Sequence, residues 1–191
     1  MRIKNGDKIL FIGDSVTDCD RGRPVGEGYF LGNGYVRFID MMLSASYPDK
    51  NFHIINMGNS GDTSLDVIAR WKTDVESFSP DVIVCNIGVN DVWRHFDSPS
   101  MTEKHVAKEI YYKSISEIAR RGRDIAREVI LLTPYFIENN VDDPMYIKMK
   151  EYASEMKRAA EENGVLCIDL QNAFTDYLKY KHPMSLTWDR I

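Results

Sequence analysis

The sequence predicts an α/β fold in which a parallel β-sheet is covered by helices on both faces, and two observations support it. Short runs rich in isoleucine, valine and leucine alternate along the chain with longer patterns of helical period. The runs are apolar throughout and too short for helices, as is typical of strands buried on both faces. Strict alternation of strands and helices favours parallel strands joined by helical crossovers.

Five of these runs are expected as strands, and the turns that follow them are expected to carry the chemistry. The carboxyl ends of parallel strands meet at one edge of the sheet, which is where ligands bind in open α/β sheets. The five runs are residues 8–12, 52–57, 81–87, 129–133 and 165–170.

Helical patterns lie between the predicted strands. The first places apolar residues 35, 39, 42 and 43 on one face, and the second does the same with residues 65, 68, 71 and 75. The second follows a capping signal, Thr63 with Asp66 three residues later. A third helix is expected over about 102–121. A fourth is expected to begin after Asp143, with Pro144 in its first turn, and to end before Gly164.

Composition fits one domain that spans residues 1–191. The chain is 43% hydrophobic and 28% charged, and a chain of this length buries a core without a metal or a disulfide. Its 24 basic and 29 acidic residues give a formal net charge of −5, and no basic run is present. This balance argues against nucleic acid or an anionic membrane as a partner. We expect no metal and no cofactor, and the aromatic and methionine residues leave room for a homo-oligomer.

The sequence also bears on location. No stretch approaches the ~20 apolar residues that span a bilayer, and the first residues lack the apolar region of a signal peptide. The three cysteines, Cys19, Cys85 and Cys167, are far apart in the sequence and form no CxxC pair. We therefore expect a reducing, cytoplasmic location.

A serine, a glycine-rich turn and an asparagine follow three successive predicted strands. Gly-Asp-Ser, ending at Ser15, follows the first strand, a turn that contains Gly61 follows the second, and Gly-Val-Asn-Asp, which contains Asn90, follows the third. Acyl transfer needs a nucleophilic hydroxyl and hydrogen-bond donors for the oxyanion, which backbone N–H groups and a side-chain amide supply. The order of these motifs therefore predicts an acyl-transfer site.

With these motifs the chain resembles the SGNH (GDSL) hydrolase family of serine esterases over essentially its whole length. The family's signature residues match Ser15, Gly61 and Asn90. Residues 17–24, 90–94 and 186–191 resemble most closely the branch of acetylxylan-esterase-like enzymes, which deacetylate carbohydrates. The resemblance implies a flavodoxin-like α/β/α sandwich with a five-stranded parallel sheet. It also implies a carboxylic ester hydrolase that removes O-acetyl groups from xylo-oligosaccharides through an acyl-enzyme.

The resemblance assigns roles to these residues. Ser15 is the nucleophile, and the N–H groups of Ser15 and Gly61 and the amide of Asn90 hold the oxyanion. The family's last motif is Asp-x-x-His, in which the aspartate, here Asp189, orients the catalytic histidine. The sequence ends at Ile191, one residue short of that histidine. We therefore expect a chain truncated just before this histidine and a C-terminal helix.

Two tryptophans are candidates for substrate binding. Trp93 and Trp188 lie beside the asparagine and aspartate motifs. Aromatic faces at the mouth of a site suit sugar rings, whose C–H faces stack well on them. The alternative is that both are partly buried packing residues.

Each candidate catalytic residue also has a simpler interpretation. Ser15 could cap a helix, Asn90 could bond to nearby backbone, and Asp189 could be a solvated turn residue. His182 is the histidine nearest to Asp189 in the sequence and is the substitute base if no later histidine exists.

Three other functions stay open at this stage. One is a broad-specificity GDSL esterase or lysophospholipase. Another is an inactive carbohydrate-binding relative, if the chain truly ends at Ile191. A flavin-binding module is the third, although Asp14, Asp18 and Asp20 in the first turn would repel a phosphate.

Overall fold

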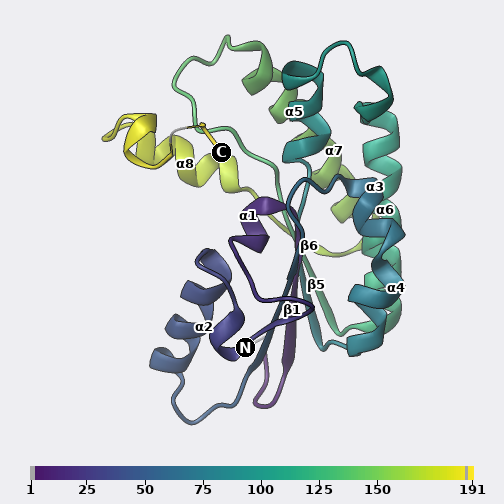
Figure 1. Cartoon of the computed structure of the whole chain (residues 1–191), viewed down its shortest axis with the longest axis vertical. Helices are drawn as coiled ribbons and strands as arrows, with labels where there is room; N and C mark the ends of the chain where they lie inside the picture. The colour runs from purple at the N-terminus through teal and green to yellow at the C-terminus, as the bar shows by residue number, and fades with distance from the viewer. Residues whose placement is uncertain (1–2, 188) are drawn as a thin grey trace.

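A computed structural model describes residues 3–187 and 189–191, and it has three layers, with a central sheet between two layers of helices (Figure 1). The sheet has six strands in the order β2-β3-β1-β4-β5-β6. The strands are β1 Lys8–Gly13, β2 Gly26–Glu27, β3 His53–Gly58, β4 Val82–Asn86, β5 Glu128–Leu132 and β6 Leu166–Ile168.

Five of the strands are parallel, as predicted. β1 pairs with β3 on one side and with β4 on the other, and β5 and β6 continue the sheet beyond β4. Numbered among themselves, the parallel strands run in the order 2-1-3-4-5, which is the flavodoxin-like order. Strand β2 was not expected: it contributes two residues to an antiparallel pairing with β3 at the edge.

Most of the expected helices are present. The helices are α1 Ser15–Asp18, α2 Tyr35–Ser46, α3 Ser64–Ala69, α4 Trp71–Asp74, α5 Val89–Asp97, α6 Lys108–Ile125, α7 Pro144–Asn163 and α8 Leu170–Leu178. Helix α7 has the predicted bounds. The Asp143 carboxylate accepts the N–H groups of Met145 and Tyr146, and Gly164 ends the helix in a left-handed conformation.

Three helical expectations need correction. The helix expected through residues 65–75 is divided into α3 and α4 at Arg70, whose guanidinium donates to backbone carbonyls of β1 and β3. Helix α6 begins at Lys108 rather than near residue 102, because residues 102–104 form a separate single turn. Met42, expected on the buried face of α2, is 68% exposed, since the face that packs on the sheet carries Tyr35, Ile39 and Leu43.

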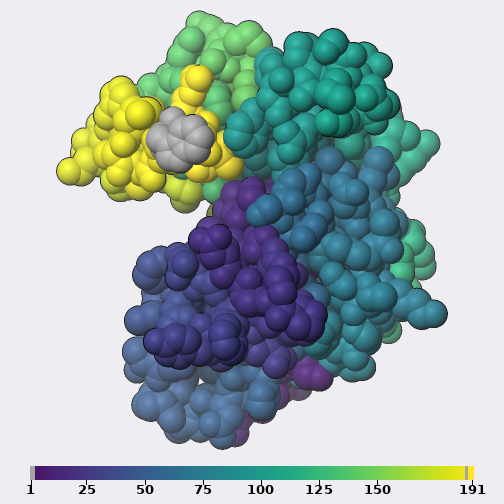
Figure 2. Space-filling model, in the orientation of Figure 1, coloured from purple at the N-terminus to yellow at the C-terminus, as the bar shows by residue number. Residues whose placement is uncertain are grey.

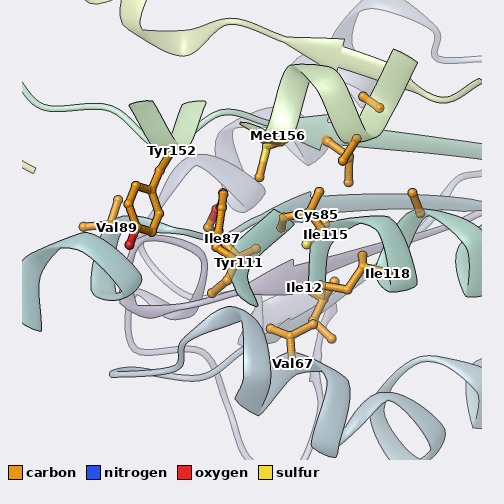
Figure 3. Close-up of a cluster of buried hydrophobic side chains, with 14 of the residues drawn as sticks. Ile12, Val67, Cys85, Ile87, Val89, Tyr111, Ile115, Ile118, Tyr152 and Met156 are labelled. Carbon is orange, nitrogen blue, oxygen red and sulfur yellow. The ribbon is translucent and has the colours of Figure 1, made fainter. Parts of the chain in front are cut away.

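The helices cover both faces of the sheet. On one face, Val67 of α3, Ile118 of α6 and Met156 of α7 share a buried cluster with Ile12 and Cys85 of the sheet (Figure 3). A second cluster lies on the other face.

In that second cluster, Val36 of α2 packs with Phe11 and Val84, and Leu170 of α8 lies against it. Both clusters support the central strands, so the ends of β1, β3 and β4 are held firmly at one edge of the sheet. Within the described ranges 3–187 and 189–191, no helix combines the length and the apolar character that crossing a membrane requires.

Candidate active site

The serine of the first motif lies where β1 gives way to helix. The chain turns directly after β1 into α1, whose N-cap is Asp14. The Asp14 carboxylate accepts the N–H of Val16 at 3.0 Å, which fixes the start of the helix. Ser15, the first residue of α1, is exposed. Its hydroxyl is therefore presented at the carboxyl edge of the sheet, and Asp14, not Ser15, is the helix cap.

The glycine and the asparagine lie beside this turn. Gly61 follows β3, is exposed and has a φ of +90°. Asn90 is buried in the first turn of α5 and donates from Nδ2 to the carbonyl of Asp62 at 2.9 Å. The Asn59 N–H donates to the carbonyl of Gly13 at 2.9 Å. The turn of residues 59–62 is thus bonded to the end of β1 on one side and to α5 on the other, so the three motifs converge at one edge.

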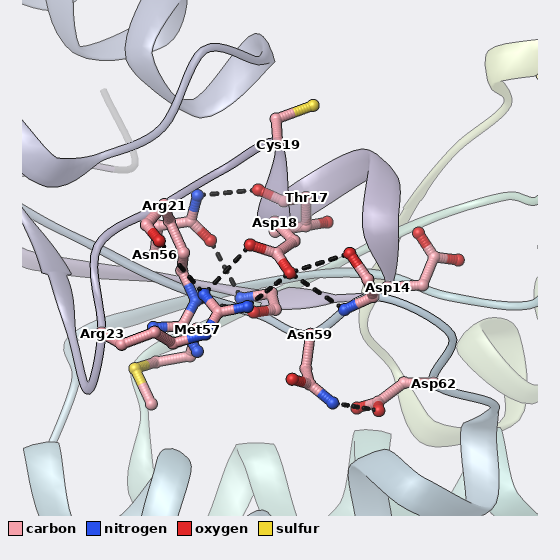
Figure 4. A network of polar contacts seen from close by, with 12 residues as sticks. Asp14, Thr17, Asp18, Cys19, Arg21, Arg23, Asn56, Met57, Asn59 and Asp62 are labelled. Atoms are coloured by element: carbon pink, nitrogen blue, oxygen red, sulfur yellow. Dashed lines mark hydrogen bonds and ion pairs between the residues drawn. The ribbon is translucent and has the colours of Figure 1, made fainter.

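A polar network, shown in Figure 4, holds α1 against β3 and the turn after it. Asp18 accepts hydrogen bonds from Ser60 through N–H at 3.0 Å and through Oγ at 2.9 Å. Arg23 donates to both carboxylate oxygens of Asp18, at 3.0 and 2.6 Å. Asn56 of β3 donates from Nδ2 to the Thr17 carbonyl at 2.7 Å. These contacts fix the position of the serine turn relative to the glycine turn.

Arg70 forms a second brace beneath the site. Its Nε lies 2.6 Å from an oxygen of Asp62, and its Nη1 lies 2.9 Å from Asp74. It also donates to the carbonyls of Met57 at 2.7 Å and Gly13 at 3.0 Å. One side chain therefore joins the ends of β1 and β3 to the turn that carries the glycine.

Buried carboxyl groups lie under the site and differ in proton affinity. The pKa of Asp14 is raised to about 7: burial is the main cause, the charges of Asp91 and Asp62 add to it, and the hydrogen bond from the Val16 N–H acts against it. Burial also raises the pKa of Asp91, to about 6, although Ser64 donates to it through both N–H and Oγ. In Asp18, burial raises the pKa, but the hydrogen bonds from Arg23 and Ser60 outweigh it and the net change is a lowering.

The aspartate of the last motif is held in a defined position. Asp189 is half-buried, and its Oδ1 accepts the Thr187 hydroxyl and the Ile191 N–H. The next residue is fixed as well: the carbonyl of Arg190 accepts the Ile137 N–H at 2.8 Å. The Asp189 side chain is thus bonded within its own turn. Trp188 lies outside the described residues.

The histidines have other partners than the serine. His182 is exposed, and its Nδ1 accepts the Met184 N–H at 3.2 Å. His95 and His105 stack on each other with ring centroids 4.4 Å apart, and each bonds to a backbone carbonyl. His53 is exposed at the amino end of β3, away from the strand ends that carry the motifs.

Two clefts open on either side of α5. The first, of about 360 Å³, is lined by Trp93, Phe136 and Asp189 together with Phe96, Asp97, Asp143, Pro144, Met145 and Arg190. The second, of about 500 Å³, contains Gly61 and Arg94. In the space-filling view, the purple N-terminal segment, the teal segment and the yellow C-terminal segment meet at one place (Figure 2). Among the residues that the structure describes, no group of three or more His, Cys, Asp or Glu side chains is placed to hold a metal ion.

Comparison with known proteins identifies the family. The sequence profile of the GDSL-like lipase/acylhydrolase family matches residues 11–187. The chain belongs to this family. The GDSL hydrolases are carboxylic ester hydrolases, and the present chain is one of them.

Relatives of this GDSL hydrolase have solved structures. It is 44% identical to an acetylxylan esterase of Geobacillus stearothermophilus, a match that covers all of this chain and 88% of the relative. The crystal structure of that esterase superposes with a TM-score of 0.97. An α/β hydrolase from the metagenome of Lake Arreo, Spain, is 43% identical, with a TM-score of 0.97 and coverage of 100% of this chain and 89% of the other.

Several structures of the Geobacillus esterase are of catalytic mutants, in which a serine, an aspartate or a histidine is replaced by alanine. The sequence patterns did not predict that Asp18, Arg23, Asn56, Ser60 and Arg70 brace the site. Several of the partners lie far away in the sequence: Ser60 for Asp18, Thr17 for Asn56 and Gly13 for Arg70.

The buried Asp14 gives a pH-dependent prediction. The pKa of Asp14 is 3.8 in the unfolded chain and about 7 in the folded protein. The protonated carboxyl therefore contributes its full stabilisation below pH 3.8, and this stabilisation is lost as the pH rises through about 7. Asp14→Asn keeps an oxygen that can accept the Val16 N–H and removes the buried charge. Each tenfold change in proton affinity corresponds to about 1.4 kcal/mol. The free energy of unfolding of the variant, relative to that of the wild type, should therefore rise by a few kcal/mol between pH 4 and pH 8.

Thermal unfolding of both proteins at pH 5 and pH 8 measures this. The Tm of Asp14→Asn relative to the wild type should rise from pH 5 to pH 8. An identical Tm difference at the two pH values would show that Asp14 does not titrate in this range.

Proposed function

We propose that this hydrolase removes acetyl groups from xylo-oligosaccharides by way of an acyl-enzyme on Ser15. The observation that carries the proposal is the convergence of Ser15, Gly61 and Asn90 on three adjacent strand ends, joined by the hydrogen bonds of the 59–62 turn. The substrate follows from the relative, an acetylxylan esterase that is 44% identical over the whole of this chain.

The chemistry follows from the positions of the groups. The Ser15 hydroxyl attacks the ester carbonyl, and the charge that develops on its oxygen is held by the N–H groups of Ser15 and Gly61 and by the Asn90 amide. The base takes the proton of the serine and later passes it to the leaving sugar oxygen. Asp189 orients the base and stabilises its charged form. Water then releases acetate from the serine by the same steps.

We place the base outside residues 1–191. The four histidines of this sequence all bond elsewhere or lie at the other end of the sheet, which supports a histidine one position beyond Ile191. That residue would complete the Asp-x-x-His spacing that begins at Asp189. The backbone hydrogen bond between Ile137 and Arg190 holds this segment at the wall of the first cleft, which Asp189 and Arg190 line.

The first cleft is the proposed sugar site. Trp93 and Phe136 supply aromatic walls, while the carboxylates of Asp97, Asp143 and Asp189 make the lining polar. Carboxylates in this number do not suit a long acyl chain, so a small acyl group on a polar alcohol fits better than a lysophospholipid. Trp188, which its place in the sequence beside Asp189 also makes a candidate for substrate binding, is part of the proposal.

The proposal also includes a cytoplasmic location and room for a homo-oligomer. Cys19, Cys85 and Cys167 are all free thiols, which supports a reducing compartment such as the cytoplasm. Phe38 and Met41 on α2 are exposed by 61% and 57%. Large exposed apolar side chains on one helix are compatible with a homo-oligomer.

Replacing the nucleophile tests the mechanism. Ser15→Ala should lower acetate release from acetylated xylo-oligosaccharides by on the order of 10⁶-fold. Its Tm should stay near that of the wild type, because Ser15 is exposed and is not the cap of α1. Ser154→Ala, at an exposed serine on α7, is the matched control and should keep full activity. Turnover that survives in Ser15→Ala would refute the assignment.

Trimming an aromatic wall of the first cleft tests the sugar site. Trp93→Ala should raise KM for an acetylated xylotriose about tenfold, the size of one good stacking contact, and should change turnover of a small aryl acetate little. Phe78→Ala, at a half-buried aromatic residue remote from the cleft lining, controls for lost packing. Equal losses on both substrates would make Trp93 a packing residue only.

Intact-mass spectrometry of the protein purified from its source tests the placement of the base. We expect a mass above the 22.0 kDa of residues 1–191, with the extra residues beginning at a histidine. If the mass is 22.0 kDa and acetate is still released, the base lies within the chain, and His182→Ala should then abolish activity. A mass of 22.0 kDa without acetate release would indicate an inactive carbohydrate-binding relative.

A further inference from the structure

The two ends of the Asn90 side chain face groups of opposite kind. Nδ2 donates to the carbonyl of Asp62 at 2.9 Å, and Nη2 of Arg94 approaches Oδ1 at 3.5 Å. A carbonyl can only accept a hydrogen bond, and a guanidinium can only donate one. Both contacts therefore favour the same orientation of the amide, with the nitrogen toward the glycine turn.

We infer that Arg94 is a positioning residue that fixes the amide of Asn90 for stabilisation of the oxyanion. This inference rests on the proposed function, in which Asn90 is an oxyanion donor. The amide nitrogen has two hydrogens, of which one is used by the Asp62 carbonyl, so the other is free for the substrate. A flipped amide would instead turn the lone pairs of Oδ1 toward the Asp62 carbonyl and toward the developing negative charge.

Asn90, Arg94 and Asp97 follow one another along one face of helix α5. Arg94 lies one helical turn after Asn90, and residues four apart share a helix face. At its other end, the guanidinium pairs through Nη1 with Asp97, three residues further on. The Arg94 and Asp97 side chains are both less than one third exposed. Asp97 therefore tethers the guanidinium where it meets the amide.

The charge of Arg94 acts in the same direction as its position. A cation beside Oδ1 polarises the amide and makes its N–H a stronger donor, as in other linked hydrogen bonds of low-dielectric sites. The carboxyl groups of Asp62 and Asp91 lie nearby, and negative charge on them opposes an oxyanion. Arg70 is already used by two carboxylates and two carbonyls. Arg94 also lines the second cleft together with Gly61, and its guanidinium is in direct contact with the Asn90 amide.

A double-mutant cycle with Asn90 tests the inference. Arg94→Met should lower kcat for a small aryl acetate about tenfold, the effect of one hydrogen bond to a charged group, with KM changed less than threefold. Asn90→Ala alone should cost roughly 10²–10³-fold. Adding Arg94→Met to Asn90→Ala should cost almost nothing more, because the group to be positioned is gone. An equal tenfold loss in both backgrounds would overturn the inference.

Two further variants separate positioning from general effects. Arg94→Lys keeps a donor and a charge and should recover part of the kcat that Arg94→Met loses. Arg120→Met is the matched control, since Arg120 also pairs with a carboxylate three residues away on a helix, Glu117 of α6, and is exposed. It should leave kcat unchanged. A loss in Arg120→Met as large as in Arg94→Met would overturn the inference.

A measurement that needs no turnover separates this inference from the proposed function. The side-chain amide signals of Asn90 in a ¹⁵N–¹H NMR spectrum are identified by their loss in Asn90→Ala. They should shift and broaden in Arg94→Met and stay unchanged in Arg120→Met. If the wild type releases no acetate, the proposed function fails, and the NMR result alone decides the positioning role. Unchanged Asn90 signals in Arg94→Met would overturn it.

Discussion

The close approach of the first helical turn to the ends of two strands is the constraint on which the site depends. A Cβ on Gly13 would lie 2.4 Å from the Thr17 hydroxyl oxygen in α1 and 2.2 Å from the Asn86 carbonyl oxygen in β4, and one on Gly58 would lie 2.2 Å from the Asp18 amide nitrogen. No side chain fits at either position. Only with glycine at both positions can α1 pack directly on the strand ends. This packing brings the serine, the glycine turn and the asparagine together.

The same packing buries carboxyl groups, and their surroundings shift their pKa values in opposite directions. Asp14 and Asp18 lie four residues apart, yet the pKa of one is raised to about 7 and that of the other is lowered. The difference comes from partners, because Asp18 receives Arg23 and Ser60, whereas Oδ2 of Asp14 has no hydrogen-bond partner among the described residues. An ionised carboxylate thus holds the glycine turn, while a carboxyl that is readily protonated lies beneath the serine without adding a full negative charge there.

Local pattern predicted much of this architecture, and long-range contacts account for what it missed. The parallel strands and α7 follow from apolar runs and from the caps Asp143 and Gly164, which act within a few residues. At the break between α3 and α4, Arg70 donates to carbonyls of β1 and β3, and no window of sequence around Arg70 contains these partners. Strand β2 has two residues and no apolar pattern of its own. The order of the motifs predicted that Ser15, Gly61 and Asn90 meet at one edge, because the carboxyl ends of parallel strands lie together. The side chains that brace them come from other parts of the sequence.

Helix α5 has a consequence for how such an enzyme can change. Within five consecutive residues it presents Asn90 toward the glycine turn, Trp93 toward one cleft and Arg94 toward the other. Because a helix moves as a rigid unit, any shift that reshapes a cleft wall also displaces the amide. Substrate range and turnover are therefore mechanically linked through this one helix. Loops that border the clefts, such as residues 98–107 and 138–143, are the places where the range of substrates can change while the amide stays where it is.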